Sequence, residues 1–142
     1  MINSTYTGIA EKLEQLYDNP MVYFDKLPQN FSAPCFFVKL INSTRKPCLW
    51  KRSELKLDFD IMYYPESNEE DVISELNDVG YKLLWGLEFI KINESTIRST
   101  DISYKIEDSV LHFLATYHMM ILEVTDKVSK MESLTQKYRV KS

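Results

Sequence analysis

Glycine, proline and cysteine are scarce in this sequence of 142 residues, which contains 3, 5 and 2 of them respectively. The glycines are scattered, so no glycine-rich loop is available to cradle a nucleotide phosphate. The same scarcity excludes collagen-like and low-complexity chains. The two cysteines, Cys35 and Cys48, form no Cys-x-x-Cys pair, and we expect both to be reduced, as in cytoplasmic proteins. A disulfide between them across a hairpin is the alternative.

Long apolar runs and targeting signals are also lacking. The strongest short run, residues 35–38, ends at Lys39, and no stretch approaches the roughly 18 apolar residues of a membrane span. The first five residues have neither the basic start nor the apolar run of a secretory signal. We therefore expect no membrane segment and no cleaved signal peptide.

Side chains typical of catalysis are equally few, and no Gly-x-Ser-x-Gly or His-Glu-x-x-His motif occurs. His112 and His118 would share a strand face about 20 Å apart, too far to bind one metal ion. Asp58 and Asp60 would lie roughly 7 Å apart, as catalytic carboxylates can, but without another polar partner we expect a solvated sheet face. We predict no enzymatic activity, no metal and no cofactor. A small enzyme is an alternative that a turnover or bound-ligand screen would reveal.

The sequence does have material for one packed core, since 44% of its residues are hydrophobic and 13% are aromatic. A disordered chain would have fewer aromatic residues and more net charge. The length suits a single domain, which we place at residues 1–142. The expected fold is α+β, with a mixed, mostly antiparallel sheet flanked by helices in the order α-β-β-β-α-β-β-β-α.

Hydrophobic periodicity gives the expected elements. Apolar spacings of three and four residues predict a helix over residues 1–17, a second that follows a cap at Ser67 and closes at Gly86, and a third over residues 128–138. Residues 67–70 form an expected capping box for the second helix, and a loose basic tail follows the third. Alternation is strictest over residues 54–64, and residues 42–47 are expected to form the turn before that strand. The other expected strands cover residues 21–27, 35–41, 89–92, 102–107 and 110–124.

Charges stand in blocks of one sign, although the formal net charge is only -4. Residues 39–52 hold five basic residues and no acidic one, and residues 66–78 hold six acidic residues and no basic one. Such opposite blocks favour self-association or docking to a partner, whereas a nucleic-acid binder would normally be net basic. The alternative is that the acidic block is only the hydrated face of a helix. The candidate interface residues are Lys39, Arg45, Lys46, Lys51, Arg52, Asp58, Asp60, Glu69, Glu70, Lys137 and Arg139.

Three aromatic stretches occur in a particular order along the chain: residues 31–38, Arg52 leading into residues 58–65, and residues 110–113 followed by Tyr117. With a helix at each end, they resemble the tail terminator family of phages and prophages of Gram-positive bacteria. The resemblance covers essentially the whole chain and implies a sheet flanked by helices. It brings no active site, and the matching apolar strand residues are expected to pack in the core.

The resemblance implies a structural protein of the virion. Such a protein forms a ring, usually of six subunits, on the head-proximal end of the tail tube. There it stops tube growth and offers a surface to the head connector or neck protein, and in contractile tails it can also meet the sheath. The implied partners are further copies of the chain, the tube protein and the connector. DNA would pass through the ring lumen without sequence-specific recognition, in the neck region of a tail assembled in the host cytoplasm.

Two other functions fit the same sequence features. One is a different neck or head-completion protein of a phage or tail-like particle, which the position of the chain on an assembled tail would distinguish. The other is a small regulatory binding module, which would be a stable monomer that never joins a tail.

Overall fold

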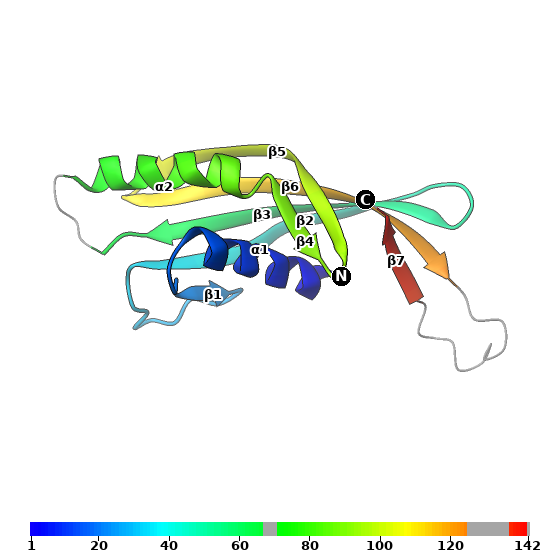
Figure 1. Ribbon diagram of the computed structural model, residues 1–142, viewed down its shortest axis with the longest axis horizontal. Helices are drawn as coiled ribbons and strands as arrows, with labels where there is room; N and C mark the ends of the chain where they lie inside the picture. The colour runs from blue at the N-terminus through cyan, green and yellow to red at the C-terminus, as the bar shows by residue number, and fades with distance from the viewer. Residues whose placement is uncertain (67–70, 125–136, 142) are drawn as a thin grey trace.

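The described residues form one curved sheet with two helices packed against it (Figure 1). The computed structural model describes residues 1–66, 71–124 and 137–141. The strands follow the order β1-β2-β3-β6-β5-β4, and β7 pairs with β6. The pair β1–β2 is parallel and the other described pairs are antiparallel, which confirms the expected mixed, mostly antiparallel α+β fold. The elements are α1 (Ile2–Leu16), β1 (Val22–Phe24), β2 (Cys35–Pro47), β3 (Arg52–Tyr64), α2 (Val72–Gly86), β4 (Phe89–Ile92), β5 (Ser95–Glu107), β6 (Val110–Val124) and β7 (Lys137–Lys141).

Strand β3 lies at the centre of the sheet because one of its faces is continuously apolar. Leu57, Phe59 and Ile61 are fully buried, while the residues between them are half-exposed. This alternation matches the period of a strand that packs one face against a core. Both helices supply residues to the same core cluster, among them Leu13 of α1 and Leu83 of α2. The strand expected at residues 54–64 is therefore confirmed, with its start two residues earlier.

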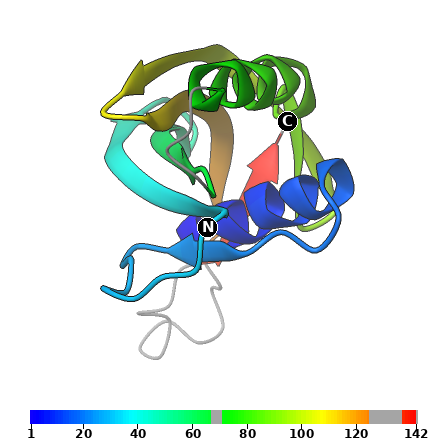
Figure 2. The same cartoon turned by 90° about the vertical axis from the view of Figure 1, so that its left-hand side faces the viewer.

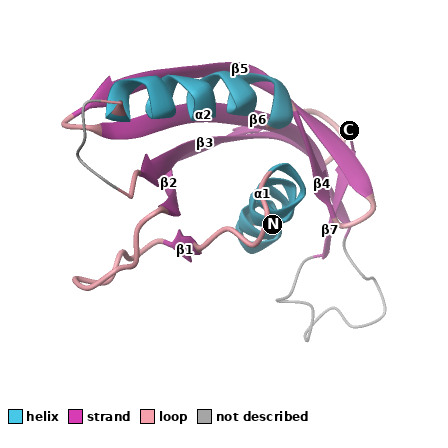
Figure 3. Cartoon of the chain, turned by 60° about the vertical axis from the view of Figure 1, so that its left-hand side comes forward, coloured by secondary structure: helices cyan, strands magenta, loops and turns pink. Residues whose placement is uncertain are grey.

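The sheet curls, and the two helices cover different parts of its buried face (Figures 2 and 3). Helix α1 lies beside β4, and α2 lies beside β5 and β6. The hairpin of β2 and β3 continues past both helices to one end of the long axis (Figure 1). All of its residues from 41 to 52 are exposed. Neither α1 nor α2 covers this end of the molecule.

Helix α1 approaches β4 most closely at Gly8. A Cβ atom at this position would press on the backbone carbonyl of Lys91, which cannot rotate away as a side chain can. At Gly86, in the last turn of α2, the atoms nearest to an added Cβ belong to the flexible side chain of Leu16. The two glycines thus differ in what surrounds them, although both lie in helices.

We expect Gly8→Ala to lower the free energy of unfolding by about 1–3 kcal/mol, because overpacking forces the backbone to shift. Alanine's higher helix propensity, about 1 kcal/mol, offsets only part of this loss. Urea denaturation of the purified variant measures the change. The control is Gly86→Ala, which gains the same helix propensity against a movable neighbour. A Gly8→Ala variant as stable as Gly86→Ala would contradict the close contact.

The expected turn at residues 42–47 is wrong, because these residues form the second half of β2. They pair with β3 from Asn42 opposite Asp58 to Pro47 opposite Ser53. The actual turn is at residues 48–51, where Trp50 and Lys51 have positive φ angles of 64° and 58°. Polar residues occupy both faces here because the hairpin has left the core, so no alternation marks the strand.

The expected closing helix and loose tail are wrong for residues 137–141, which form β7. Beyond the irregularity between Ser99 and Asp101, β5 leaves β6 and pairs with β4 instead. The open edge of β6 that results is filled by β7, with Val140 opposite Ile121. Strand pairing thus overrides the helical spacing of the sequence at this position. The remainder of the expected helix lies outside the described residues.

Two further expectations concern the N-terminal cap of α2 and the state of the two cysteines. The capping box at residues 67–70 lies outside the described residues, and Asp71, which precedes α2, makes no capping hydrogen bond with its side chain. Both cysteines are free, with Cys35 buried at the start of β2 and Cys48 exposed at its far end. The alternative of a hairpin disulfide is therefore wrong.

Candidate functional site

The basic block of the sequence forms the exposed end of the β2–β3 hairpin. We call residues 45–52 the basic arm, because Arg45, Lys46, Lys51 and Arg52 lie there without an acidic residue. Its backbone is closed by a 2.8 Å hydrogen bond from the Cys48 amide to the Arg52 carbonyl. The arm therefore projects four positive charges on a regular hairpin.

Two large apolar side chains occupy the turn of the basic arm. Leu49 is 80% exposed and Trp50 is 84% exposed. Sequence reasoning singled out the charges of this segment and missed these two residues. The signal that was available is an apolar pair between basic residues, at a point where a hairpin turn would normally carry glycine or asparagine.

Asp58 and Asp60 lie on the opposite face of the sheet from the helices, but they are not simply solvated. An Asp60 carboxylate oxygen lies 3.1 Å from Nδ1 of His112, and its other oxygen is buried without a partner among the described residues. Asp58 accepts hydrogen bonds from Thr116 and from Asn42. These contacts tie β2, β3 and β6 together. Both carboxylates therefore have polar partners, and the expectation of a solvated face without them is wrong.

The remaining basic candidates are distributed along the sheet. Lys39 is exposed on β2 opposite Asp60, well away from the basic arm along the strand. The other two lie on β7, whose register puts Arg139 opposite Leu122 of β6, while Arg52 of the arm lies opposite the same residue from β3. The fold thus brings the basic C-terminal strand to the same end of the sheet as the basic arm.

The acidic candidates of α2 divide into described and undescribed residues. Glu69 and Glu70 lie outside the described residues, whereas Asp71, Glu75 and Asp78 line an open groove beside Tyr17.

Burial raises the pKa of the Tyr17 hydroxyl to about 12, and the Asp78 carboxylate adds to that rise. The ammonium of Lys82 lies 4.2 Å from the centre of the Tyr17 ring.

An aromatic ridge runs beside these carboxylates on α2. Tyr81 is 63% exposed and Trp85 is 68% exposed, and their rings meet edge to face at 6.5 Å. Ile73 is also exposed, on the other flank of the helix from Glu75. Sequence reasoning missed the ridge, although its four-residue spacing falls off the apolar stripe that packs α2 on the sheet. We call Asp71, Glu75, Asp78, Tyr81 and Trp85 together the outer face of α2.

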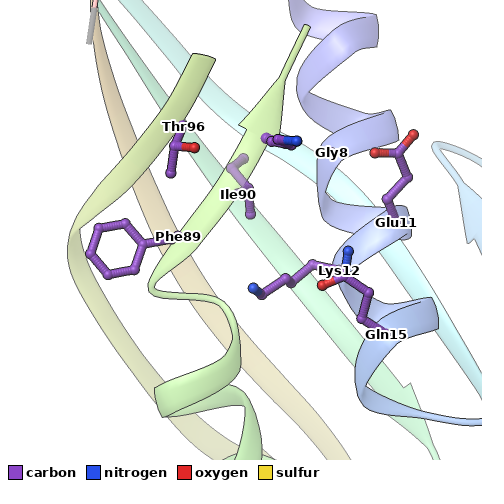
Figure 4. A pocket seen from close by; sticks show the side chains of 8 residues that line it. Gly8, Glu11, Lys12, Gln15, Phe89, Ile90 and Thr96 are labelled. Atoms are coloured by element: carbon purple, nitrogen blue, oxygen red, sulfur yellow. The ribbon is translucent and has the colours of Figure 1, made fainter. Parts of the chain in front are cut away.

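A cleft of about 270 Å³ lies between α1 and β4 (Figure 4). Lys12 extends toward β4, while Glu11 lies on the side of α1 away from β4. Thr96 and Glu11, the carboxylate among the lining residues, lie on opposite sides and do not form a hydroxyl–carboxylate pair. Within the described part of the chain, no three His, Cys, Asp or Glu side chains come together as a metal site requires. No helix among the described residues is long and apolar enough to cross a membrane.

Comparison with known proteins gives one assignment. The sequence model of a protein family described as "Phage tail terminator protein" matches residues 5–129. This stretch runs from the first turn of α1 past the end of β6, and so includes the basic arm and the outer face of α2. The search of curated proteins finds no match.

Proposed function

Because this chain belongs to the phage tail terminator family, we propose that six copies form a ring on the head-proximal end of the tail tube. Membership of the family makes the chain a structural component of the virion tail with a role in tail assembly, and the family is not a family of enzymes. We propose that the ring stops polymerisation of the tube protein. Its second face provides the docking surface for the head connector or collar.

The observation that carries this proposal is the family match over residues 5–129, because it spans both helices and the sheet up to β6. The surface of the described fold supports it. A terminator must fit the last tube ring on one side and refuse further tube subunits on the other, which requires two unlike surfaces. The basic arm and the outer face of α2 are unlike in charge and lie on different parts of the molecule (Figure 1).

We propose the ring lies in the neck region, after assembly in the host cytoplasm, and that DNA passes through its lumen. The formal net charge of -4 and the separate basic and acidic surfaces favour protein partners over sequence-specific DNA binding. In a contractile tail, the same ring would contact the last sheath ring. A Gram-positive host is also part of this proposal and rests on the sequence resemblance.

We expect the double reversal Arg45→Glu and Lys46→Glu to impair ring formation or attachment to the tube. Both side chains are exposed, so the fold should be unaffected. Exposed charges are screened within about 8 Å at physiological ionic strength, so association of the wild-type protein should also weaken as salt rises. Sedimentation with purified tubes at increasing salt measures both effects.

The matched control is Lys26→Glu with Lys105→Glu, two exposed lysines outside the basic arm. This pair changes the net charge by the same amount and should leave attachment unchanged. If the arm variant and the control attach equally well, the arm is only a solvated hairpin end.

The experiment that tests the proposed function is tube growth in vitro. Purified protein added to polymerising tube protein should halt elongation at one end only, at a stoichiometry of one ring per tube. Electron microscopy of tubes with a marked starting end measures growth at each end separately. Unchanged elongation at both ends, with the protein folded and in excess, would overturn the proposal.

A further inference from the structure

The chain contains two tryptophans, and the structure exposes both, Trp50 in the basic arm and Trp85 on the outer face of α2. Tryptophan is on average a highly buried residue, and it is enriched among the residues that dominate protein interfaces. We propose that the basic arm of one copy docks on the outer face of α2 of the next copy. This inference rests on the proposed ring and specifies the contact that closes it.

The turn of the basic arm has features that favour binding to another surface. Trp50 and Lys51 have positive φ angles, a backbone conformation that costs free energy for residues with a side chain and favours glycine or asparagine. A hairpin turn selected only for folding would use those residues. Here the turn instead presents Leu49 and Trp50 almost fully to solvent.

The outer face of α2 has the chemistry to receive this arm. Tyr81 and Trp85 form an apolar ridge, and Asp78 lies three and seven residues before them, on the same side of the helix. Acidic and aromatic groups therefore lie side by side. Asp71, Glu75 and Asp78 contribute three negative charges here, and Lys82 in the same groove contributes one positive charge. The net charge of this face is therefore negative, against the four positive charges of the arm.

The geometry favours a second copy as the occupant. The turn of the arm lies at one end of the long axis, and α2 lies in the other half of the molecule (Figure 1). The two surfaces thus cannot meet within one chain. A two-fold contact of arm against arm would oppose like charges, whereas arm against α2 joins opposite charges and pairs tryptophan with tryptophan. Such a contact between unlike surfaces is heterologous and closes into a ring when the rotation between copies fits.

The test uses full-length chains with either surface disabled. Trp50→Ser disables the arm, and the pair Tyr81→Ser and Trp85→Ser disables the outer face of α2. Each should lower association by about 30-fold or more, as expected for loss of an interface tryptophan. Mixed together, the two variants should form one-to-one pairs that do not grow, because one intact arm can still dock on one intact α2. Light scattering and mass measurement distinguish pairs from rings.

Native fluorescence provides a second readout that does not depend on disabling either surface. Trp50→Phe leaves Trp85 as the sole tryptophan, and Trp85→Phe leaves Trp50. In each case, the emission should shift to shorter wavelength and lose accessibility to acrylamide when the ring forms. Emission and accessibility that stay unchanged in an assembled ring would overturn the contact for that residue.

Disulfide formation between copies tests which surface the basic arm contacts. Cys48 adjoins the turn of the arm and is exposed, so it should form a disulfide between copies with the variant Tyr81→Cys in assembled rings. The control Lys105→Cys, on the other face of the sheet, should not form one.

Two outcomes would overturn this inference and leave the proposed function standing. They are rings that assemble normally without the disulfide, and disabled variants that still form rings. Crosslinking of Cys48 to the tube protein would also overturn it, because the arm would then bind that partner. Absence of any ring on tubes would refute the proposed function itself.

Discussion

Particles assembled without this protein should carry tail tubes of uncontrolled length or should fail to join heads. A tube grows because each ring offers the surface that recruits the next ring, so removing the terminator leaves the growing end active. The expected loss of infectious particles is near complete, because neither defect leaves a joined, functional tail. Deletion of the gene, followed by electron microscopy of the tails and a count of infectious particles, measures this effect.

Supply of the wild-type protein in trans is the control for the deletion. It should restore both tail length and head joining, whereas the Arg45→Glu and Lys46→Glu variant should restore them poorly. Tails of normal length with heads attached, in the absence of the protein, would show that the chain does not act as the terminator of that particle.

The second large effect is expected in the core. Phe59→Ala should lower the free energy of unfolding by about 3–5 kcal/mol, the usual cost of removing a buried phenylalanine ring. Phe59 is fully buried between β2 and β6, and its ring meets those of Tyr6 at 5.2 Å and Tyr117 at 6.5 Å. Because the free energy of unfolding of a domain is only about 5–15 kcal/mol, this loss removes a large part of the stability of the protein. Denaturant unfolding measures it.

The matched control is Phe59→Leu, which retains most of the buried volume and should cost markedly less. Lys56→Ala, on the same strand but exposed, should be nearly neutral. If Phe59→Ala unfolds at the same denaturant concentration as the wild type, the core does not centre on β3.

Sequence periodicity predicted the elements that pack against the core. The strands at residues 89–92 and 110–124 match β4 and β6 at both ends. The second helix ends at Gly86 as expected, while its expected cap at Ser67 lies outside the described residues. Burial on one face imposes alternation on a strand and a three-to-four spacing on a helix, so the sequence records it. The central strand was recognised for the same reason, through Leu57, Phe59 and Ile61.

The elements that sequence reasoning missed lie outside the core. The second half of β2 and the basic arm are exposed on both faces, so hydrophobic alternation does not mark them. Strand β7 depends on an edge of β6 that opens only because β5 turns away, which is a property of the whole sheet. Exposure of Trp50 and Trp85 was equally hidden, since a large aromatic residue in a sequence is normally assigned to the core.

The contacts of the acidic candidates were also beyond the sequence. Asp60 and His112 are 52 positions apart, and only the pairing of β3 with β6 brings them within 3.1 Å. Charge blocks, in contrast, could be read directly, because like charges close in sequence remain close on a hairpin or a helix. The sequence therefore predicts the charge of the basic arm and of α2, but not the exposure of their aromatic residues.

A reconstruction of the assembled particle tests the central claim most directly. The account predicts one ring of six copies of this chain on the head-proximal end of the tail tube, between the last tube ring and the head connector. A chain found elsewhere on the particle, or present as closed two-fold dimers, would contradict it.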